Sequence, residues 1–294
     1  MIAQLLDGRI VANAVYHDLK NEIDQLREDG CEPFLTVVIV GDDPASKTYV
    51  RNKHRACEKN GIRSETIELP AETTEADLLG LISELNGNDD VHGILVQLPL
   101  PGHIREDRII EAIVPEKDVD GFHPVNRGKL AAGADCFEPC TPAGIRHIFK
   151  HYHIEPKGKH LVVIGRSQIV GIPFALMMMQ KKEWANATVT VCHTATADVS
   201  QHTKMADIVV LAAGHPHTLT GDMIKPGCVV IDVGTNRVED AQAEKGYRWV
   251  GDADFDSVKE IAGMITPVPG GVGPMTIAML LKNTVRAAKL LHQK

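Results

Sequence analysis

The sequence predicts an α/β protein of two domains, each built on a parallel sheet. Buried strands alternate with helical segments along the chain, and this alternation is typical of parallel sheets rather than of barrels or sandwiches. A length of 294 residues is enough for two domains that each bury a substantial core. An irregular segment at residues 115–140 separates two series of elements and is expected to link the domains.

Composition and charge narrow the class of protein. Hydrophobic residues make up 44% and charged residues 24%, which is ordinary for a soluble globular protein. The net charge of −8, without any basic cluster, argues against a nucleic-acid partner. The first residues lack the features of a signal peptide, and the longest apolar stretch, Ile169 to Met179, is too short to span a bilayer. We therefore expect a cytoplasmic protein with no membrane partner.

The cysteines and histidines do not form a recognisable metal site. The six cysteines show no Cys-x-x-Cys pair, and the 14 histidines form no His-Glu-x-x-His motif. Cys136 and Cys140 could be ligands, but no second pair or histidine supports them. We expect reduced, mostly packed thiols and no bound metal.

The first series of elements follows from hydrophobic periodicity. Apolar residues recur at a helical period over residues 10–28, and the run from Phe34 to Val40 is typical of a buried strand. Asp43 or Ser46 can cap the helix that follows, with Pro44 near its first turn. The pattern then predicts a helix at 45–60, a strand at 62–69, a helix at 78–85 and a strand at 93–97.

The helix at residues 45–60 carries a lysine where an apolar residue is expected. At about 100° per residue, its charged side chains fall on one side, while Lys53 lies with Tyr49 and Cys57 on the less polar side. A broken local rule of this kind is enriched at functional sites. The alternative is that Lys53 extends its ammonium group past the core into solvent.

Two further features of the first series suggest a ligand site. Gly41 and Gln97 follow the carboxyl ends of two predicted strands, where ligands of parallel sheets collect, so the Lys53 helix and Gln97 are expected to border one cleft. Asp118 and Asp120 stand two residues apart in the linking segment. They are either solvated turn residues or carboxylates that line the cleft between the domains.

The second series begins with a strand, a turn and a helix from His160 onward. A dinucleotide pyrophosphate would bind at the start of this helix, although Ser167 and Val170 replace the second and third glycines of the usual motif. The strand at residues 187–193 ends without the acidic residue that typically binds the ribose of NAD. Arg166 could pair with a 2′-phosphate, which favours NADP, or it could be a solvated turn residue.

The rest of the chain continues this sheet and ends in a helix. Strands are predicted at 207–211 and 227–232, each followed by a loop. Residues 266–276 combine prolines and glycines into a rigid loop whose backbone can approach a flat ligand closely, or they form a plain turn. Apolar periodicity predicts a last helix at 275–291.

Six motifs together resemble one known family. In this sequence they read Val40-Gly-Asp-Asp-Pro-Ala-Ser46 with Tyr49-x-x-x-Lys53, Val96-Gln-Leu-Pro-Leu-Pro101, Lys117-Asp-Val-Asp-Gly121, Val163-Ile-Gly-Arg-Ser-x-Ile-Val-Gly171, Val233-Gly-x-Asn-Arg237 and Pro267-Val-Pro-Gly-Gly-Val-Gly-Pro-Met-Thr276. The chain thereby resembles the bifunctional methylenetetrahydrofolate dehydrogenase/cyclohydrolase family from Leu6 to about Lys289. No single motif would support this, but their order and number are specific.

The resemblance implies an architecture and two activities. A tetrahydrofolate-binding catalytic domain of residues 1–118, completed by the C-terminal helix 275–294, and a Rossmann-like NADP-binding domain of residues 119–274 would enclose a cleft, in a homodimer. NADP-dependent oxidation would convert 5,10-methylenetetrahydrofolate to the methenyl form, and hydrolysis would then give 10-formyltetrahydrofolate. Such an enzyme belongs to one-carbon metabolism and purine biosynthesis.

The resemblance also implies residue roles. Lys53 is the catalytic lysine, Gln97 hydrogen-bonds near it, Asp120 anchors the pterin, and Tyr49 stacks on the folate. Val96, Leu98, Pro269, Gly270, Gly271 and Gly273 complete the folate site. Gly165, Arg166, Ser167, His193, Thr194 and Thr235 contact NADP. Thr235 stands where bacterial relatives often have Ile, which matters little if the contact is made by the backbone.

Residue chemistry agrees with these roles. The pterin edge presents a pair of donors that a carboxylate accepts bidentately. A lysine acts as a base toward water only where its surroundings disfavour the charged form, and a neutral Gln97 can hold the amine without restoring that charge. Three alternatives remain: a dehydrogenase that lacks the hydrolase step, a non-catalytic NADP or folate sensor, and another NADP-linked oxidoreductase.

Overall fold

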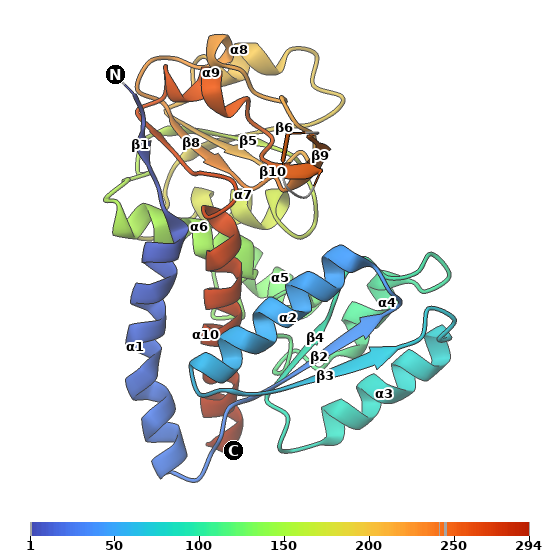
Figure 1. Ribbon diagram of the computed structural model, residues 1–294. Helices are drawn as coiled ribbons and strands as arrows, with labels where there is room; N and C mark the ends of the chain where they lie inside the picture. Colours follow the sequence, from blue (N-terminus) through green and yellow to red (C-terminus); the bar gives the residue numbers. More distant parts are fainter. Residues whose placement is uncertain (1, 241, 244–245, 294) are drawn as a thin grey trace. The chain divides into compact units, whose positions relative to one another are not determined.

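The computed structural model describes residues 2–240, 242–243 and 246–293, which divide into two compact units (Figure 1). Unit 1 comprises residues 1–13, 130–133 and 140–276, and unit 2 comprises residues 14–129, 134–139 and 277–294. Two long helices, α1 (Gly8–Glu28) and α10 (Val272–His292), run from unit 1 into unit 2. The predicted α/β class, with two parallel sheets, is confirmed.

Unit 2 is organised around a three-stranded parallel sheet. Its order is β3-β2-β4, with β2 (Phe34–Val40) between β3 (Arg63–Leu69) and β4 (Gly93–Val96). All seven residues of β2 are buried, as the unbroken apolar run predicts for a strand covered on both faces. The chain moves from β2 to β3 in one direction across the sheet and from β3 to β4 in the other. Because both crossovers are right-handed, their helices, α2 (Pro44–Lys59) and α3 (Glu75–Gly87), cover opposite faces of the sheet.

The core of unit 2 lies between its sheet and the helices α3 and α4 (Glu106–Ala112). Alternate residues of β2 point into it, because successive strand side chains face opposite sides. Its central members are Phe34, Val38, Val40, Leu78, Ile82, Ile94 and Ile109. Lys289 of α10 donates a hydrogen bond to Glu22 of α1, so the two long helices are also joined within this unit.

Unit 1 contains a six-stranded parallel sheet of order β1-β11-β8-β7-β5-β6. Its strands are β1 (Gln4–Leu5), β11 (Met264–Ile265), β8 (Val229–Asp232), β7 (Ile208–Leu211), β5 (His160–Ile164) and β6 (Thr188–Cys192). After the edge strand β1, the chain returns to the sheet at β5, adds β6 on one side of β5 and then continues from β7 on the other. The order therefore reverses between β5 and β7, and this switch point is where open α/β sheets bind their ligands.

Helices and a hairpin complete unit 1. The helices are α6 (Cys140–His151), α7 (Gly171–Met179), α8 (Val199–Thr203) and α9 (Phe255–Lys259), with a 3₁₀ turn at Gly221–Met223. An antiparallel pair, β9 (Asn236–Glu239) and β10 (Tyr247–Val250), stands apart from the large sheet. The core of the unit is built from β-strand residues that include Val162, Ile164, Val209, Leu211, Val230 and Ile265.

Three details of the predicted secondary structure were wrong. The segment 115–140, expected to be irregular, contains α5 (Pro124–Ala131), a short helix that shows only a weak apolar period and contains Gly128. The expected loop at residues 233–237 ends early, because β9 begins at Asn236. The loop at 266–276 ends at residue 271, where α10 begins one turn earlier than predicted.

The structure can be compared with the expectations about thiols, membrane-spanning helices and metal sites. All six cysteines are buried, as expected for packed thiols. Across residues 2–240, 242–243 and 246–293, no helix is long and apolar enough to cross a membrane. Those same residues hold no group of three or more His, Cys, Asp or Glu side chains placed to bind a metal ion.

Candidate active site

The helix α2 places Lys53 inside unit 2. Asp43 caps the helix by accepting a hydrogen bond from the Ser46 amide at 2.7 Å, and Pro44 occupies the first turn. The buried residues of α2 are Ser46, Val50, Lys53 and Cys57. Their spacing of four, three and four residues is that of one helix face, so Lys53 belongs to the stripe that packs against the sheet.

The ammonium group of Lys53 is held inside the unit. The side chain is 8% exposed, and its Nζ donates a 3.0 Å hydrogen bond to Oε1 of Gln97. This contact contradicts the alternative in which Lys53 extends into solvent. Lys53 therefore lies on the buried face of α2, with Val50 and Cys57 as neighbours on that face.

Gln97 is fixed from three directions at the carboxyl end of β4. Its backbone amide donates to the Val38 carbonyl of β2 at 2.8 Å, and its Nε2 donates to the Leu98 carbonyl at 2.6 Å. With the amide nitrogen engaged in this way, Oε1 is the atom that faces Lys53. This contact confirms that the Lys53 helix and Gln97 lie close together, while the cleft that they were expected to border stays a prediction.

The other residues predicted to lie near Lys53 differ in how far they are buried. Tyr49 lies one helical turn before Lys53, on the same side of α2 as predicted, but it is exposed and not part of the buried stripe. Val96 is buried at the end of β4, and Leu98 is half-buried after it. An exposed aromatic ring beside a buried lysine leaves an apolar face available for stacking against a flat ligand.

The two aspartates of the linking segment have different environments. Asp118 is buried, and its carboxylate accepts hydrogen bonds from the Phe122 amide, the His123 amide and Nδ2 of Asn126. Burial raises the pKa of Asp118 to about 6. Its oxygens therefore hold the turn that leads into α5. Asp120 is only half-buried, and it is the carboxylate of the pair that is open to solvent.

Lys117 of the same motif has a structural contact. Its buried Nζ donates hydrogen bonds to the carbonyls of Leu85, Asn86 and Asn88, at the carboxyl end of α3. Carbonyls at a helix end lack partners within the helix, so a cation there is stabilising. Burial lowers the pKa of Lys117.

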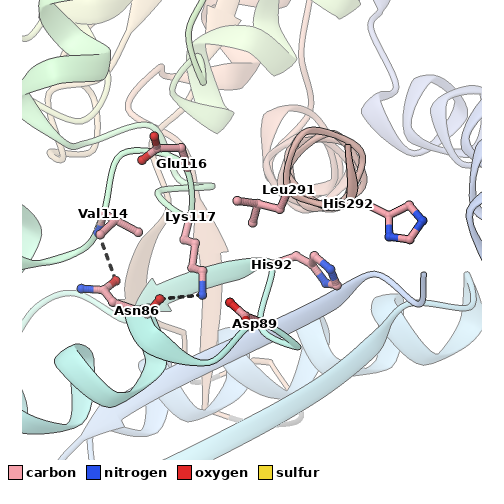
Figure 2. Close-up of a pocket in the computed structure, with 8 residues that line it drawn as sticks. All are labelled: Asn86, Asp89, His92, Val114, Glu116, Lys117, Leu291 and His292. Atoms are coloured by element: carbon pink, nitrogen blue, oxygen red, sulfur yellow. Dashed lines mark hydrogen bonds between the residues drawn. The ribbon is translucent and has the colours of Figure 1, made fainter. Parts of the chain in front are cut away.

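A cavity of about 620 Å³ adjoins Lys117 (Figure 2). It is lined by Asn86, Asp89, His92, Val114, Glu116, Lys117, Leu291 and His292. His92 precedes β4 whereas Gln97 follows it, so this cavity lies at the opposite end of that strand from the Lys53 contact. Its lining includes neither Lys53 nor Gln97, and none of the residues predicted to contact the folate or NADP.

In unit 1, the predicted cofactor residues gather at the carboxyl edge of the parallel sheet. Gly165, Arg166 and Ser167 follow β5, His193 and Thr194 follow β6, and Thr235 follows β8. Because the strands are parallel, their carboxyl ends meet at one edge. Arg166, Ser167, Thr194 and Thr235 are exposed there, and His193 is half-buried.

Glycine is required at two positions of this edge. Gly165 has a φ of +123°, and a Cβ at this position would lie 2.2 Å from the Ala212 carbonyl oxygen at the switch point. A Cβ at Gly171 would lie 2.1 Å from the Gly165 carbonyl oxygen. Gly171 therefore provides the close helix–strand contact expected of the third motif glycine, one position after Val170. This role was missed because the spacing is longer than the usual pattern.

The first turn of α7 presents backbone amides beside Ser167. The Ser167 hydroxyl accepts hydrogen bonds from the amides of Val170 and Gly171 at 3.2 and 3.4 Å. The Ile172 amide donates to the Ser167 carbonyl at 3.1 Å, so Ser167 caps this turn and its amides are already engaged. The close backbone approach at Gly165 and the exposed Arg166 fit a dinucleotide with a phosphate on its ribose.

The loop at residues 266–271 packs against the start of α1. The Gly8 amide donates to the Gly270 carbonyl at 2.9 Å, and a Cβ at Gly8 would lie 1.7 Å from the Gly271 carbonyl oxygen. Gly270 has a φ of +109°, and Pro269 before it is exposed, while Gly273 lies in the first turn of α10. A Cβ at Gly271 would lie 2.6 Å from the Pro267 carbonyl oxygen, so Gly8 and Gly271 serve close packing within unit 1, a reason for their presence that the sequence pattern did not reveal.

Comparison with known proteins agrees with this arrangement. A family model described as the tetrahydrofolate dehydrogenase/cyclohydrolase catalytic domain matches residues 6–120, and one described as the NAD(P)-binding domain of the same enzymes matches residues 139–292. The chain belongs to the tetrahydrofolate dehydrogenase/cyclohydrolase family. Its predicted activities, an oxidoreductase and a hydrolase of one-carbon folate metabolism, are confirmed by this membership.

Individual members of the family are similar over almost their full length. The bifunctional protein FolD of Prosthecochloris aestuarii is 54% identical over 291 residues, covering 98% of this chain and 99% of the relative. The crystal structure of FolD from Campylobacter jejuni has a TM-score of 0.92 at 49% identity, covering 98% of this chain and 99% of that one.

A third relative has been solved with its cofactor. The Trypanosoma brucei enzyme, complexed with NADP and an inhibitor, has a TM-score of 0.92 at 42% identity and covers 99% of this chain and 98% of that one. The predicted NADP cofactor agrees with this complex and with the NAD(P)-binding domain of the family.

Proposed function

We propose that Lys53 is the general base of the hydrolase step and that Gln97 holds it in place. The observation that carries this proposal is the 3.0 Å hydrogen bond between Lys53 Nζ and Gln97 Oε1 in a buried stripe of α2. A neutral acceptor orients the amine without the charge stabilisation that a carboxylate would give. The amine can then lose its proton at a lower cost and accept one from water.

The hydrolysis requires one proton acceptor near the methenyl carbon. Water attacks this carbon of 5,10-methenyltetrahydrofolate, and its proton passes to the Lys53 amine. The bond between the carbon and N5 then breaks, N5 takes up a proton, and the formyl group stays on N10. The positive charge of the methenyl substrate beside the ammonium would further favour the neutral amine.

We propose that the folate is bound by the residues that the family motif assigns. Half-buried Asp120 would accept the donor pair of the pterin edge, while Asp118 is committed to the turn into α5. Tyr49 would stack on the flat ring system. Val96, Leu98, Pro269, Gly270, Gly271 and Gly273 would form the apolar and backbone surfaces of the site.

NADP, when bound, accepts the hydride from the methylene carbon. We propose that the turn at Gly165 and Ser167 binds its pyrophosphate, and that Arg166 pairs with the 2′-phosphate. His193, Thr194 and Thr235 would contact the rest of the molecule. The acid nearest after β6 is Asp198, whose carboxylate accepts from the amides of Ser200 and Gln201 as the cap of α8, so it is engaged there rather than with a ribose.

We propose the remaining features on the basis of the family. The catalytic domain would comprise residues 1–118 with the helix 275–294, and the NADP domain residues 119–274. The family models match residues 6–120 and 139–292, which supports a division near this point. A cytoplasmic homodimer that supplies purine biosynthesis is the expected biological context.

The test is a two-step assay on the purified protein. 5,10-Methylenetetrahydrofolate is added with NADP and, separately, with NAD, and absorbance reports both the reduced cofactor and the methenyl compound. We expect NADPH to form with little accumulation of methenyl compound. Accumulation that matches NADPH formation would indicate a dehydrogenase without the hydrolase step. No reduced cofactor with either nucleotide would contradict the proposal.

A further inference from the structure

Two buried aspartates join the loops at the carboxyl edge of the unit 1 sheet. Asp232 is the last residue of β8, and Asp252 lies two residues after β10. They are 3% and 0% exposed, and neither belongs to the motifs assigned to the cofactor or the folate. Buried carboxylates are costly unless hydrogen bonds compensate for lost water, so the contacts they make need an explanation.

Asp252 holds the loop after β7. Its Oδ2 accepts hydrogen bonds from the amides of Ala213 and Gly214 at 2.7 and 2.9 Å. Its Oδ1 accepts from Nδ2 of Asn236 at 2.8 Å. One carboxylate therefore fixes the chain immediately beyond β7 and the first residue of β9.

Asp232 holds the loop after β8 and the backbone of Asp252. Its Oδ1 accepts from the amides of Gly234 and Asp252, both at 2.9 Å, and its Oδ2 accepts from the Ala253 amide at 2.8 Å. Burial raises the pKa of this carboxyl to about 6. The three amide donors nevertheless stabilise the ionised form.

The fit around the two carboxylates is close. A Cβ at Gly234 would lie 2.1 Å from Oδ1 of Asp252, and a Cβ at Gly251 would lie 2.0 Å from Oδ2 of Asp232. The backbone thus touches each carboxylate directly, which leaves these loops little freedom to shift. We refer to Asp232 and Asp252, with these contacts, as the aspartate pair.

The loops held by the aspartate pair border the cofactor site. Ala212 directly precedes Ala213 and Gly214, whose amides donate to Asp252. The carbonyl oxygen of Ala212 lies so close to Gly165, at the switch point of the sheet, that a Cβ on Gly165 would collide with it. Thr235 lies between Gly234 and Asn236, one bound by Asp232 and the other by Asp252. The pair therefore sets the backbone position of both segments.

We propose that Asp232 and Asp252 are positioning residues for NADP, which hold the backbone at Ala213, Gly214 and Thr235 in the conformation that the bound cofactor requires. The inference rests on the proposed cofactor site. It assigns the aspartates no contact with the cofactor and no part in the hydrolysis at Lys53.

The test separates cofactor binding from hydrolysis. Asp252→Asn keeps the shape but places an NH₂ group where the carboxylate accepts hydrogen bonds. We expect the KM and the Kd for NADP to rise about 10- to 100-fold, since two or more charge-assisted hydrogen bonds are weakened. The rate of 5,10-methenyltetrahydrofolate hydrolysis, assayed without NADP, should stay within about twofold of the wild type. The control is Asp256→Asn, which changes an exposed carboxylate on α9. Its KM and Kd for NADP and its hydrolysis rate should all stay within about twofold of the wild type.

Two results would overturn the inference. One is an unchanged Kd for NADP in folded Asp252→Asn protein, and the other is an equal loss of NADP reduction and hydrolysis, which would indicate a general structural role. If Asp252→Asn fails to fold, Asn236→Ala decides, because it removes one donor to the pair: a Kd for NADP raised about 3- to 10-fold supports the inference, and an unchanged Kd contradicts it. NADP reduction by the wild type shows independently whether the proposed function holds.

Discussion

Nζ of Lys53 and Oε1 of Gln97 lie 3.0 Å apart, in a contact between the buried face of α2 and the carboxyl end of β4. Gln97 is a neutral amide, and it is itself fixed through Val38 and Leu98. The contact holds the lysine amine at a defined point, and the predictions about catalysis follow from it.

A carboxylate in place of the amide should impair the hydrolase. Gln97→Glu would put a negative charge next to the Lys53 amine and favour the ammonium form, which cannot accept a proton. We expect hydrolysis of the methenyl substrate at pH 7 to fall at least about tenfold, with the optimum displaced to higher pH. The pH–rate profile measures this, with exposed Gln25→Glu as the control; superimposable profiles for Gln97→Glu and wild type would refute the role of neutrality.

Arg166 should determine the choice between the two nucleotides. Arg166→Ala removes the cation expected to pair with the 2′-phosphate, so we expect the KM for NADP to rise about 10- to 100-fold and the KM for NAD to change little. Initial rates over both nucleotide concentrations measure the ratio. Lys181→Ala, at another exposed cation of unit 1, should leave the ratio unchanged, and an equal loss for both nucleotides in Arg166→Ala would contradict the assignment.

Asp118 should make stability depend on pH. Burial raises its pKa from 3.8 to about 6, so between these values the folded protein keeps a proton that the unfolded chain releases. This group therefore stabilises the fold most at low pH, and its contribution falls as pH rises through that window. Asp118→Asn cannot titrate, so its free energy of unfolding relative to wild type should increase by roughly 2 kcal/mol between about pH 4 and pH 7.

Denaturant unfolding at several pH values measures this difference. Because Asn cannot accept all the hydrogen bonds from Phe122, His123 and Asn126, the variant is expected to be less stable than wild type overall. The exposed Asp24→Asn in α1 serves as the control and should run parallel to wild type. A constant difference between Asp118→Asn and wild type across the pH range would show that the raised pKa does not contribute.

Much of the fold was predictable because its strands are continuous apolar runs. β2, β5 and β7 lie where the sequence predicts them, since a strand covered on both faces leaves the same pattern wherever it occurs. β9 and α5 were missed for the opposite reason. β9 has four residues, of which only Val238 is apolar, so it shows no apolar run, and α5 is short and interrupted by a glycine.

The candidate site was predictable only for residues whose place on a helix face or at a strand end can be derived from the sequence. A lysine in a buried stripe and a glutamine at a strand end could be paired in advance, because both features are visible along the chain. Asp118 and Asp120 could not be told apart, since their difference depends on which backbone amides the fold brings to each. Asp232 and Asp252, 20 residues apart and joined mainly through backbone amides, leave no pattern at all.

The most direct test of the account is the activity of Lys53→Met. This change keeps an unbranched side chain in the stripe and removes the amine. We expect hydrolysis of 5,10-methenyltetrahydrofolate to fall by about 10²- to 10⁴-fold, the usual contribution of a general base, while NADP binding and the fold persist. Lys59→Met, at the exposed end of α2, should be as active as wild type. Full hydrolase activity in Lys53→Met would contradict the central claim.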